Sequence, residues 1–430
     1  MKRILSFILL LSILVYPIRA LAFHEEDSAG VIPSDLGLDA AASLLPADAL
    51  SLDGEAILVY ERRTGTLVYG KNVDAARYPA SLTKLMTCLL ALEHSAPWEE
   101  VTVTSSALET LDPSGSFAGL WPGETYTMEQ LLYCLMVQSA NDAALVIAEY
   151  IGGSQESFVE MMNDKAEELG CTGTHFVNPH GMHDPDHYST ARDLAKITEA
   201  AMEYDLFRSL YSTASYVLPA TDTREERTLN STNYLISTAI NAEYYDSRVI
   251  GGKTGFTTPA GRCVMCTAID EEYAYLAVIL GASGTDEAGK TVYGGFITAS
   301  ALFDTCLWGF SKADCLEAGQ QFTAEVPGGA WDALLIATED VTALLPVSYD
   351  PALLSYIPSL DPELEAPLEE DQAAGSLLVY YGDVLVGEAP LYTLEAVDRV
   401  SPPPAAKADL APGRFPEPLG NPWCRLPFRL

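Results

Sequence analysis

Basic residues and cysteines are both scarce in this chain. Lys and Arg number 24 against 60 Asp and Glu, which gives a formal net charge of −36 over 430 residues. So acidic a chain repels phosphate backbones, which excludes nucleic acid as the expected partner. The eight cysteines are too sparse for a disulfide-built scaffold. With 48% hydrophobic and 20% charged residues, the composition is that of a globular protein of two or three domains.

Long apolar runs are absent except at the N-terminus. Lys2 and Arg3 precede an apolar run over residues 4–16, and Ala20-Leu21-Ala22 then fits the small-x-small pattern of a cleavage site. The run is short for a membrane span, which needs about 20 residues. Residues 1–22 therefore read as a secretory signal peptide. An uncleaved anchor is the alternative interpretation.

Changes in composition divide the rest of the chain into four parts. Residues 23–48 are mixed polar and Ala-rich and indicate a linker. Residues 49–315 combine helix and strand patterns. Residues 316–400 carry only short strand patterns, at 341–345, 376–381 and 384–386, and predict a small β-rich domain. The tail 401–430 contains eight prolines, a composition that resists regular structure.

The patterns within 49–315 predict a sheet with helices on its faces. A hairpin is expected from residues 56–61 and 67–70, and a helix from about 81 to 92, where apolar residues recur at helical spacing. Helical patterns recur at 128–137, 141–151, 155–169, 191–203 and 296–309, and strand patterns at 262–269 and 273–282. Because strands and helices do not alternate strictly, an α+β arrangement is favoured over βαβ units.

The first of three short motifs stands at the start of the helix expected from residue 81. It reads Ser81-Leu82-Thr83-Lys84, and residues three apart share a helix face, so the hydroxyl and the ammonium group can meet. A serine becomes a nucleophile when a base takes its proton, and a lysine can be that base if burial or a nearby cation lowers its pKa. Since S-x-x-K also occurs on solvated helix faces, this motif alone identifies no site.

The second motif, Ser139-Ala140-Asn141, lies between two helical patterns. On a loop, a hydroxyl and an amide two residues apart can both point into one cleft. The alternative is that Ser139 or Asn141 simply caps the helix that follows.

The third motif, Lys253-Thr254-Gly255, comes after a glycine pair and before strand-like sequence. Glycines in a strand let a ligand or another backbone approach closely. Lys253 and Thr254 would offer a charge and a hydroxyl to a carboxylate. A turn with a surface lysine is the alternative interpretation.

The order and wide separation of the three motifs decide between these alternatives, because together they form the signature of the serine penicillin-recognising enzymes. The chain resembles the D-alanyl-D-alanine carboxypeptidases, the low-molecular-weight penicillin-binding proteins. The resemblance covers about 49–315 strongly and 316–400 more weakly. It is carried by the segments at 78–87, 176–181, 187–193, 230–235 and 252–257.

The resemblance implies a β-lactamase/DD-peptidase-like catalytic domain, with an antiparallel sheet flanked by helices, followed by a small β-rich C-terminal domain. It implies that Ser81 attacks the carbonyl of a terminal D-Ala-D-Ala bond while Lys84 takes its proton. Ser139 would relay a proton to the leaving amine, with Lys253 supporting it electrostatically.

The resemblance also implies how substrate is held. Asn141 would position Lys84 and the substrate amide, and Thr254, next to Gly255, would hold the terminal carboxylate. Backbone N–H groups of Ser81 and Phe256 would form the oxyanion hole. Peptidoglycan stem peptides are the implied substrates and β-lactams the implied inhibitors, and no metal or organic cofactor is needed. The expected place of action is the cell wall or periplasmic space.

Two features depart from the family pattern. Many relatives carry a carboxylate-binding arginine just before the last catalytic-domain helix, but Lys290 is the only basic residue between Arg262 and Lys312. The proline-rich tail also denies the chain the amphipathic membrane-binding helix with which relatives often end, so we expect membrane contact to be weak or confined to the signal segment.

Other interpretations remain open at this stage. Glu226 lies in an E-x-x-L-N segment that resembles the deacylating segment of class A β-lactamases, although it lies far beyond Asn141. A non-catalytic wall-binding scaffold on the same fold is a third possibility, but all three motifs are intact. Cys263 and Cys266 match C-x-x-C, yet residues three apart on a strand point to opposite faces. The histidines at 180, 183 and 187 read as part of an ordered loop rather than as a metal site.

Overall fold

The computed structural model describes residues 42–400, except for residues 240, 271 and 286–287. The expected signal peptide, most of the expected linker and the proline-rich tail lie outside the described residues. Within the part of the chain that the structure describes, no helix has the length and apolar character to cross a membrane.

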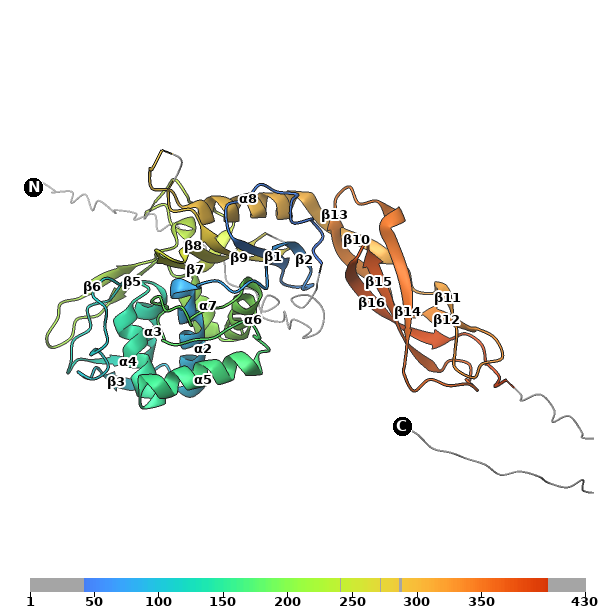
Figure 1. Cartoon of the computed structure of the whole chain (residues 1–430), viewed down its shortest axis with the longest axis horizontal. Coiled ribbons are helices and arrows are strands. Elements are labelled where there is room, and N and C mark those ends of the chain that lie inside the picture. Colours follow the sequence, from blue (N-terminus) through green and yellow to red (C-terminus); the bar gives the residue numbers. More distant parts are fainter. Residues whose placement is uncertain (1–41, 240, 271, 286–287, 401–430) are drawn as a thin grey trace, which may run out of the picture.

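A five-stranded antiparallel sheet forms the centre of the first part of the chain (Figure 1). The predicted hairpin is confirmed as β1 and β2, and both predicted strands beyond residue 260 are confirmed as β8 and β9. In sheet order the strands are β2 (Leu67–Lys71), β1 (Ala56–Glu61), β9 (Ala274–Ala282), β8 (Gly261–Ile269) and β7 (Val249–Thr257). The strand nearest the N-terminus, β1, thus pairs with β9, the last strand of this sheet along the chain.

Both faces of this sheet are buried, and alternate residues of each strand enter different cores. On β1, Leu58 and Tyr60 belong to the core that the sheet shares with α2 and α6, whereas Ile57 and Val59 belong to the core beneath α8. Figure 1 shows α8 on one side of the sheet and the other helices on the opposite side. This burial on both faces explains why the central strand β9 is apolar along its whole length.

Five predicted helices are confirmed, and side-chain caps mark the first residue of some of them. Thr127 and Gln130 form a capping box at the start of α3, and the side chain of Thr190 accepts the N–H of Asp193 at the start of α6. The helices are α3 (Met128–Met136), α4 (Asn141–Gly152), α5 (Gln155–Glu168), α6 (Ala191–Met202) and α8 (Gly294–Gly309).

The helix expected from residue 81 begins later than the sequence predicts. Residues Ala80–Thr83 form a 3-10 turn, η1, and the α-helix α2 spans Lys84–His94. The sequence also missed the short helix α7 (Asp205–Ser212) and two small hairpins, because elements this short have little periodicity to detect. The hairpins are β3 (Glu100–Thr102) with β4 (Thr125–Thr127) and β5 (Ser215–Leu218) with β6 (Arg227–Asn230).

The second part of the chain is β-rich, as predicted. A five-stranded sheet has the order β11-β12-β16-β15-β14, and β10 pairs with β13 (Figure 1). Three of these strands were predicted: β13 (Val341–Pro346), β15 (Ala373–Tyr381) and β16 (Val384–Thr393), the last two joined at Gly382. Four were missed: β10 (Phe310–Leu316), β11 (Gln321–Ala324) and β14 (Leu354–Leu360), whose apolar residues are few or interrupted, and the short apolar strand β12 (Ala333–Ala337).

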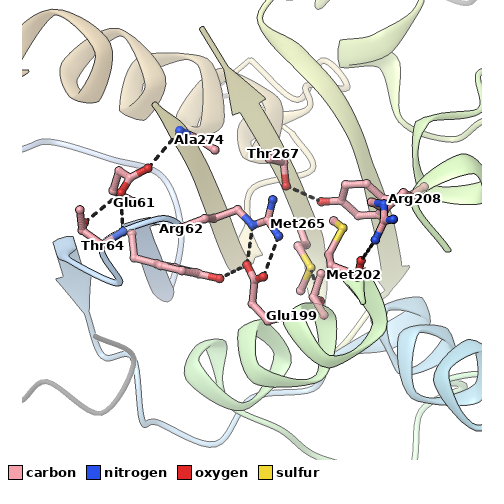
Figure 2. Close-up of polar contacts among 12 residues, drawn as sticks. Glu61, Arg62, Thr64, Glu199, Met202, Arg208, Met265, Thr267 and Ala274 are labelled. Carbon is pink, nitrogen blue, oxygen red and sulfur yellow. Dashed lines mark hydrogen bonds and ion pairs between the residues drawn. The ribbon is translucent and has the colours of Figure 1, made fainter. Parts of the chain in front are cut away.

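A buried ion pair links α6 to the residue that follows strand β1 (Figure 2). The guanidinium of Arg62 donates to both carboxylate oxygens of Glu199 at 2.7 Å, and the hydroxyl of Tyr60 donates to the same carboxylate. The side chains of Arg62 and Glu199 are only 7% and 8% exposed. Breaking a buried pair leaves one charge without a partner, which destabilises far more than loss of a surface pair.

Replacement of Glu199 by Ala should therefore lower the free energy of unfolding by about 3–5 kcal/mol, because Arg62 would stay buried and unpaired. Denaturant unfolding of the catalytic part measures this change. Glu168→Gln is the matched control: Glu168 pairs with Lys165 on α5 but is 68% exposed, so we expect a loss of about 1 kcal/mol or less. Equal losses in the two variants would contradict a stabilising role for the buried pair.

Candidate active site

Ser81 lies on the 3-10 turn η1, one helical turn ahead of α2. The residue before it, Ala80, has a φ of +48°, a left-handed conformation that is rare for alanine. Gly181 packs against this turn so closely that a Cβ there would lie 1.9 Å from the carbonyl oxygen of Ala80. Packing of Gly181, which is distant in the sequence, therefore constrains the backbone next to Ser81.

Lys84 is the centre of a buried hydrogen-bond network. Its Nζ donates to Ser81 Oγ at 3.0 Å, to Asn141 Oδ1 at 2.7 Å and to the backbone oxygen of His180 at 2.7 Å. These three acceptors use all three protons of an ammonium group. The network thus joins the first motif to the second and fixes the lysine against the serine hydroxyl.

The second motif contributes two side chains to the same site. Ser139 has a φ of +60°, and α4 begins at Asn141 with Ala140 as its N-cap, without any side-chain cap. The alternative that Ser139 or Asn141 caps the following helix is therefore wrong. The strained turn instead directs Asn141 to Lys84 and Ser139 to Lys253, whose Nζ donates to Ser139 Oγ at 2.7 Å.

The third motif occupies the edge strand β7. Lys253 is 1% exposed, and its neighbour Thr254 lies 2.5 Å from the hydroxyl of Thr232. A Cβ on Gly255 would lie 2.8 Å from the backbone nitrogen of Ser81, so only glycine lets β7 pass this close to the serine. Phe256, the next residue, exposes 56% of its surface. All three motifs therefore meet at one place.

Burial lowers the pKa values of both lysines of the site, and the charge of Lys253 adds to this effect at Lys84. Burial, together with the positive charge of Lys253, lowers the pKa of Lys84 well below its ordinary value, and the nearby Asp142 partly opposes this. Burial alone lowers the pKa of Lys253 to about 7. A lysine with a strongly lowered pKa can be neutral near neutral pH, which is what a general base requires.

A cavity of about 570 Å³ opens over these residues. Its lining includes Ser81, Ser139, Asn141, Thr254, Gly255 and Phe256 among the sequence-predicted residues. The sequence interpretation assigned no role to three other lining residues: Thr232, Arg262 and Tyr293. Thr232 lies in a segment that carried the family resemblance, but no sequence signal marked Arg262 or Tyr293.

The comparisons with known proteins agree with this geometry. The family model described as D-alanyl-D-alanine carboxypeptidase matches residues 44–284, more than half of the chain. The chain belongs to the D-alanyl-D-alanine carboxypeptidase family. The family model described as penicillin-binding protein 5, C-terminal domain, matches residues 310–399. These matches confirm the resemblance inferred from the motifs and the expected fold class. They also confirm the predicted activity, that of a serine-type D-Ala-D-Ala carboxypeptidase that acts on peptidoglycan.

Relatives match nearly the whole length of this carboxypeptidase. The curated D-alanyl-D-alanine carboxypeptidase DacF of Bacillus subtilis is 30% identical, over 92% of this chain and 94% of its own. Two solved structures are also similar. Penicillin binding protein 5 of Haemophilus influenzae is 25% identical, with a TM-score of 0.62 over 83% of this chain and 100% of its own. Penicillin binding protein 6B of Escherichia coli is 27% identical, with a TM-score of 0.60 over 82% and 98%.

Of the residues behind the rival interpretations, Cys263 lines the cavity, whereas Glu226 and Cys266 do not. Glu226 is exposed in the segment before β6 and does not line the cavity. Cys263 and Cys266 are buried, unpaired and enter opposite cores, as the strand geometry predicted. Among the residues described here, no group of His, Cys, Asp or Glu side chains is arranged to hold a metal ion. His187 is instead buried against Thr83, 2.7 Å from its hydroxyl.

Proposed function

We propose that this carboxypeptidase removes the terminal D-Ala from peptidoglycan stem pentapeptides through an acyl-enzyme on Ser81. The observation that carries the proposal is the contact of 3.0 Å between Ser81 Oγ and the buried Nζ of Lys84. A hydroxyl and a lysine of lowered pKa at this distance form a nucleophile with its base. The serine remains partly accessible in the cavity while the lysine is fully buried.

In the acylation step, Ser81 Oγ attacks the carbonyl carbon of the penultimate D-Ala, and the hydroxyl proton passes to neutral Lys84. The carbonyl oxygen becomes an oxyanion that the backbone N–H groups of Ser81 and Phe256 stabilise. The close passage of Gly255, the residue before Phe256, by the Ser81 nitrogen supports this pairing. Asn141 holds Lys84 and binds the substrate amide.

Collapse of the tetrahedral intermediate breaks the peptide bond and releases D-Ala. The leaving nitrogen needs a proton, and Ser139 relays it, supported by the positive charge of Lys253 at 2.7 Å. Thr254 holds the terminal carboxylate during these steps. Water then hydrolyses the ester on Ser81, and every group that the mechanism uses comes from the chain itself.

The same attack on a β-lactam would open its ring and leave a slowly released adduct, so we propose covalent penicillin binding at Ser81.

We further propose secretion through cleavage after residue 22, with action in the cell wall or periplasmic space and weak membrane contact. A catalytic part at 49–315 and a β-rich part at 316–400 complete the proposal. The family matches at 44–284 and 310–399 support this division, and β10 at the boundary pairs with β13 of the second part.

Release of D-Ala from a synthetic stem pentapeptide tests the proposal directly. Purified protein should release one D-Ala per peptide, and penicillin should block the release while it labels the protein covalently. Rapid turnover of the penicillin without a lasting adduct would favour the β-lactamase interpretation. Absence of both release and labelling would favour a non-catalytic scaffold.

The pH dependence of kcat/KM for this release should be bell-shaped. Activity should rise as Lys84 loses its proton, because the base must be neutral, and it should fall above about pH 7 as Lys253 loses its charge. Lys253→Arg keeps a charge that cannot titrate in this range, so the alkaline fall should disappear while the acidic rise remains. An unchanged alkaline fall in this variant would contradict the role given to Lys253.

A further inference from the structure

Arg262 is a cation in the wall of the active-site cavity, and the residues that the structure describes supply no anion for it. Its Nε is buried and has no hydrogen-bond partner, and none of its nitrogens donates to, or pairs with, another residue that the structure describes. A buried N–H group without a hydrogen-bond partner is costly, even on a side chain that is otherwise partly exposed. The lining of the cavity includes no Asp or Glu side chain among the described residues.

The strand register puts Arg262 on the face of the sheet that carries Thr254. Phe256 on β7 is paired directly with Arg262 on β8, and Thr254 lies two residues along the same strand. Paired residues and residues two apart in a strand point to the same face, so Thr254 and Arg262 are diagonal neighbours. Lys253 and Gly255 point to the opposite face, towards the nucleophile.

Two aromatic rings hold the guanidinium in place. The central carbon of the Arg262 guanidinium lies 3.9 Å from the ring centroid of Tyr293 and 5.2 Å from that of Phe256. Stacking of this kind fixes the plane of the group and leaves its N–H edge available for a planar anion. Tyr293 is itself held in an aromatic cluster with Tyr234 and Phe296.

We infer that Arg262 binds the C-terminal carboxylate of the substrate, together with Thr254, and so makes the enzyme specific for a free chain end. The inference rests on the proposed attack of Ser81 on the bond before the last residue, which places the terminal carboxylate one residue beyond the nucleophile. A guanidinium edge matches a carboxylate with two parallel hydrogen bonds. The hydroxyl of Thr254, already shared with Thr232, supplies a third contact.

No cation from the start of α8 competes for this role. The residues immediately before α8 include Lys290, but its side chain is exposed and does not line the cavity. At the start of α8 itself stand Gly294 and Gly295, and a Cβ on Gly295 would already lie 3.0 Å from Val264. The cationic contact for the carboxylate is therefore supplied from strand β8 rather than from the helix.

The test compares two substrates that differ only at the chain end: a stem pentapeptide with a free carboxylate and the same peptide with a terminal carboxamide. Wild-type enzyme should cleave the free acid with the higher kcat/KM. In Arg262→Ala, kcat/KM for the acid should fall about 10- to 100-fold, the equivalent of lost charge-assisted hydrogen bonds, while the value for the amide should change little. The preference for the acid should therefore collapse towards unity.

Two further variants make the result interpretable. Arg262→Lys keeps the positive charge but cannot form two parallel hydrogen bonds to a carboxylate. Its preference for the free acid over the amide should therefore be intermediate. This variant also replaces Arg262→Ala in the test if the alanine variant folds poorly. Arg224→Ala removes another arginine stacked on an aromatic ring, Trp121, outside the cavity, and should leave the preference unchanged. Equal losses on both substrates in both Arg262 variants would assign Arg262 a purely structural role and overturn the inference. If the wild-type enzyme cleaves neither peptide, the proposed function fails instead.

Discussion

Ser81→Ala should abolish covalent labelling by a fluorescent penicillin and lower D-Ala release by at least about 10⁴-fold. The acyl bond needs the serine oxygen, and no other hydroxyl among the described residues is hydrogen-bonded to Lys84. The variant should fold normally, because Ser81 Oγ accepts only one of the three hydrogen bonds of Lys84. Gel fluorescence after incubation with the penicillin measures the loss.

Ser95→Ala is the matched control for this experiment. Ser95 follows the last residue of the same helix α2, and its hydroxyl donates to the carbonyl of Ala91, far from the cavity. Labelling should be unchanged in this variant. Labelling that persists in Ser81→Ala would show that another residue is the nucleophile.

Lys84→Arg should lower the rate of acylation by about 10²–10⁴-fold, the usual contribution of a general base. Arginine carries a permanent positive charge and cannot give up its proton, so Ser81 would lose its proton acceptor. The low pKa that burial and Lys253 impose on Lys84 is what makes this difference large. Stopped-flow measurement of acylation by a chromogenic β-lactam gives the rate directly.

Lys84→Met complements the arginine variant because it removes both the base and the charge. It also leaves the carbonyl of His180 and the amide oxygen of Asn141 without their donor. Both variants should be slow to a similar degree if proton transfer is the role of Lys84. If Lys84→Arg acylates at nearly the wild-type rate, the lysine acts through its charge alone and another group must take the proton.

The spacing of residues along the sequence was enough to identify the three motifs, because each motif spans only three or four residues. Ser81 and Lys84 are three residues apart, so a single helical turn brings them together, whether it is a 3-10 turn or an α-helix. The sequence did not reveal that the turn is 3-10, since the left-handed conformation of Ala80 depends on the packing of Gly181 from elsewhere in the chain. The long helices and the buried strands were predictable from periodicity for the same local reason.

The sequence by itself determined the family and the three motifs that we propose carry the reaction, because motif order and helical spacing are properties of the chain alone. Only the tertiary structure decided which of them meet. Ser139 and Lys253 are 114 residues apart, and the pairing of β7 with β8 brings Arg262 to the face that carries Thr254. Such contacts depend on register and packing between distant segments. A residue like Arg262 therefore becomes visible only when the fold leaves its charge unpaired in the cavity.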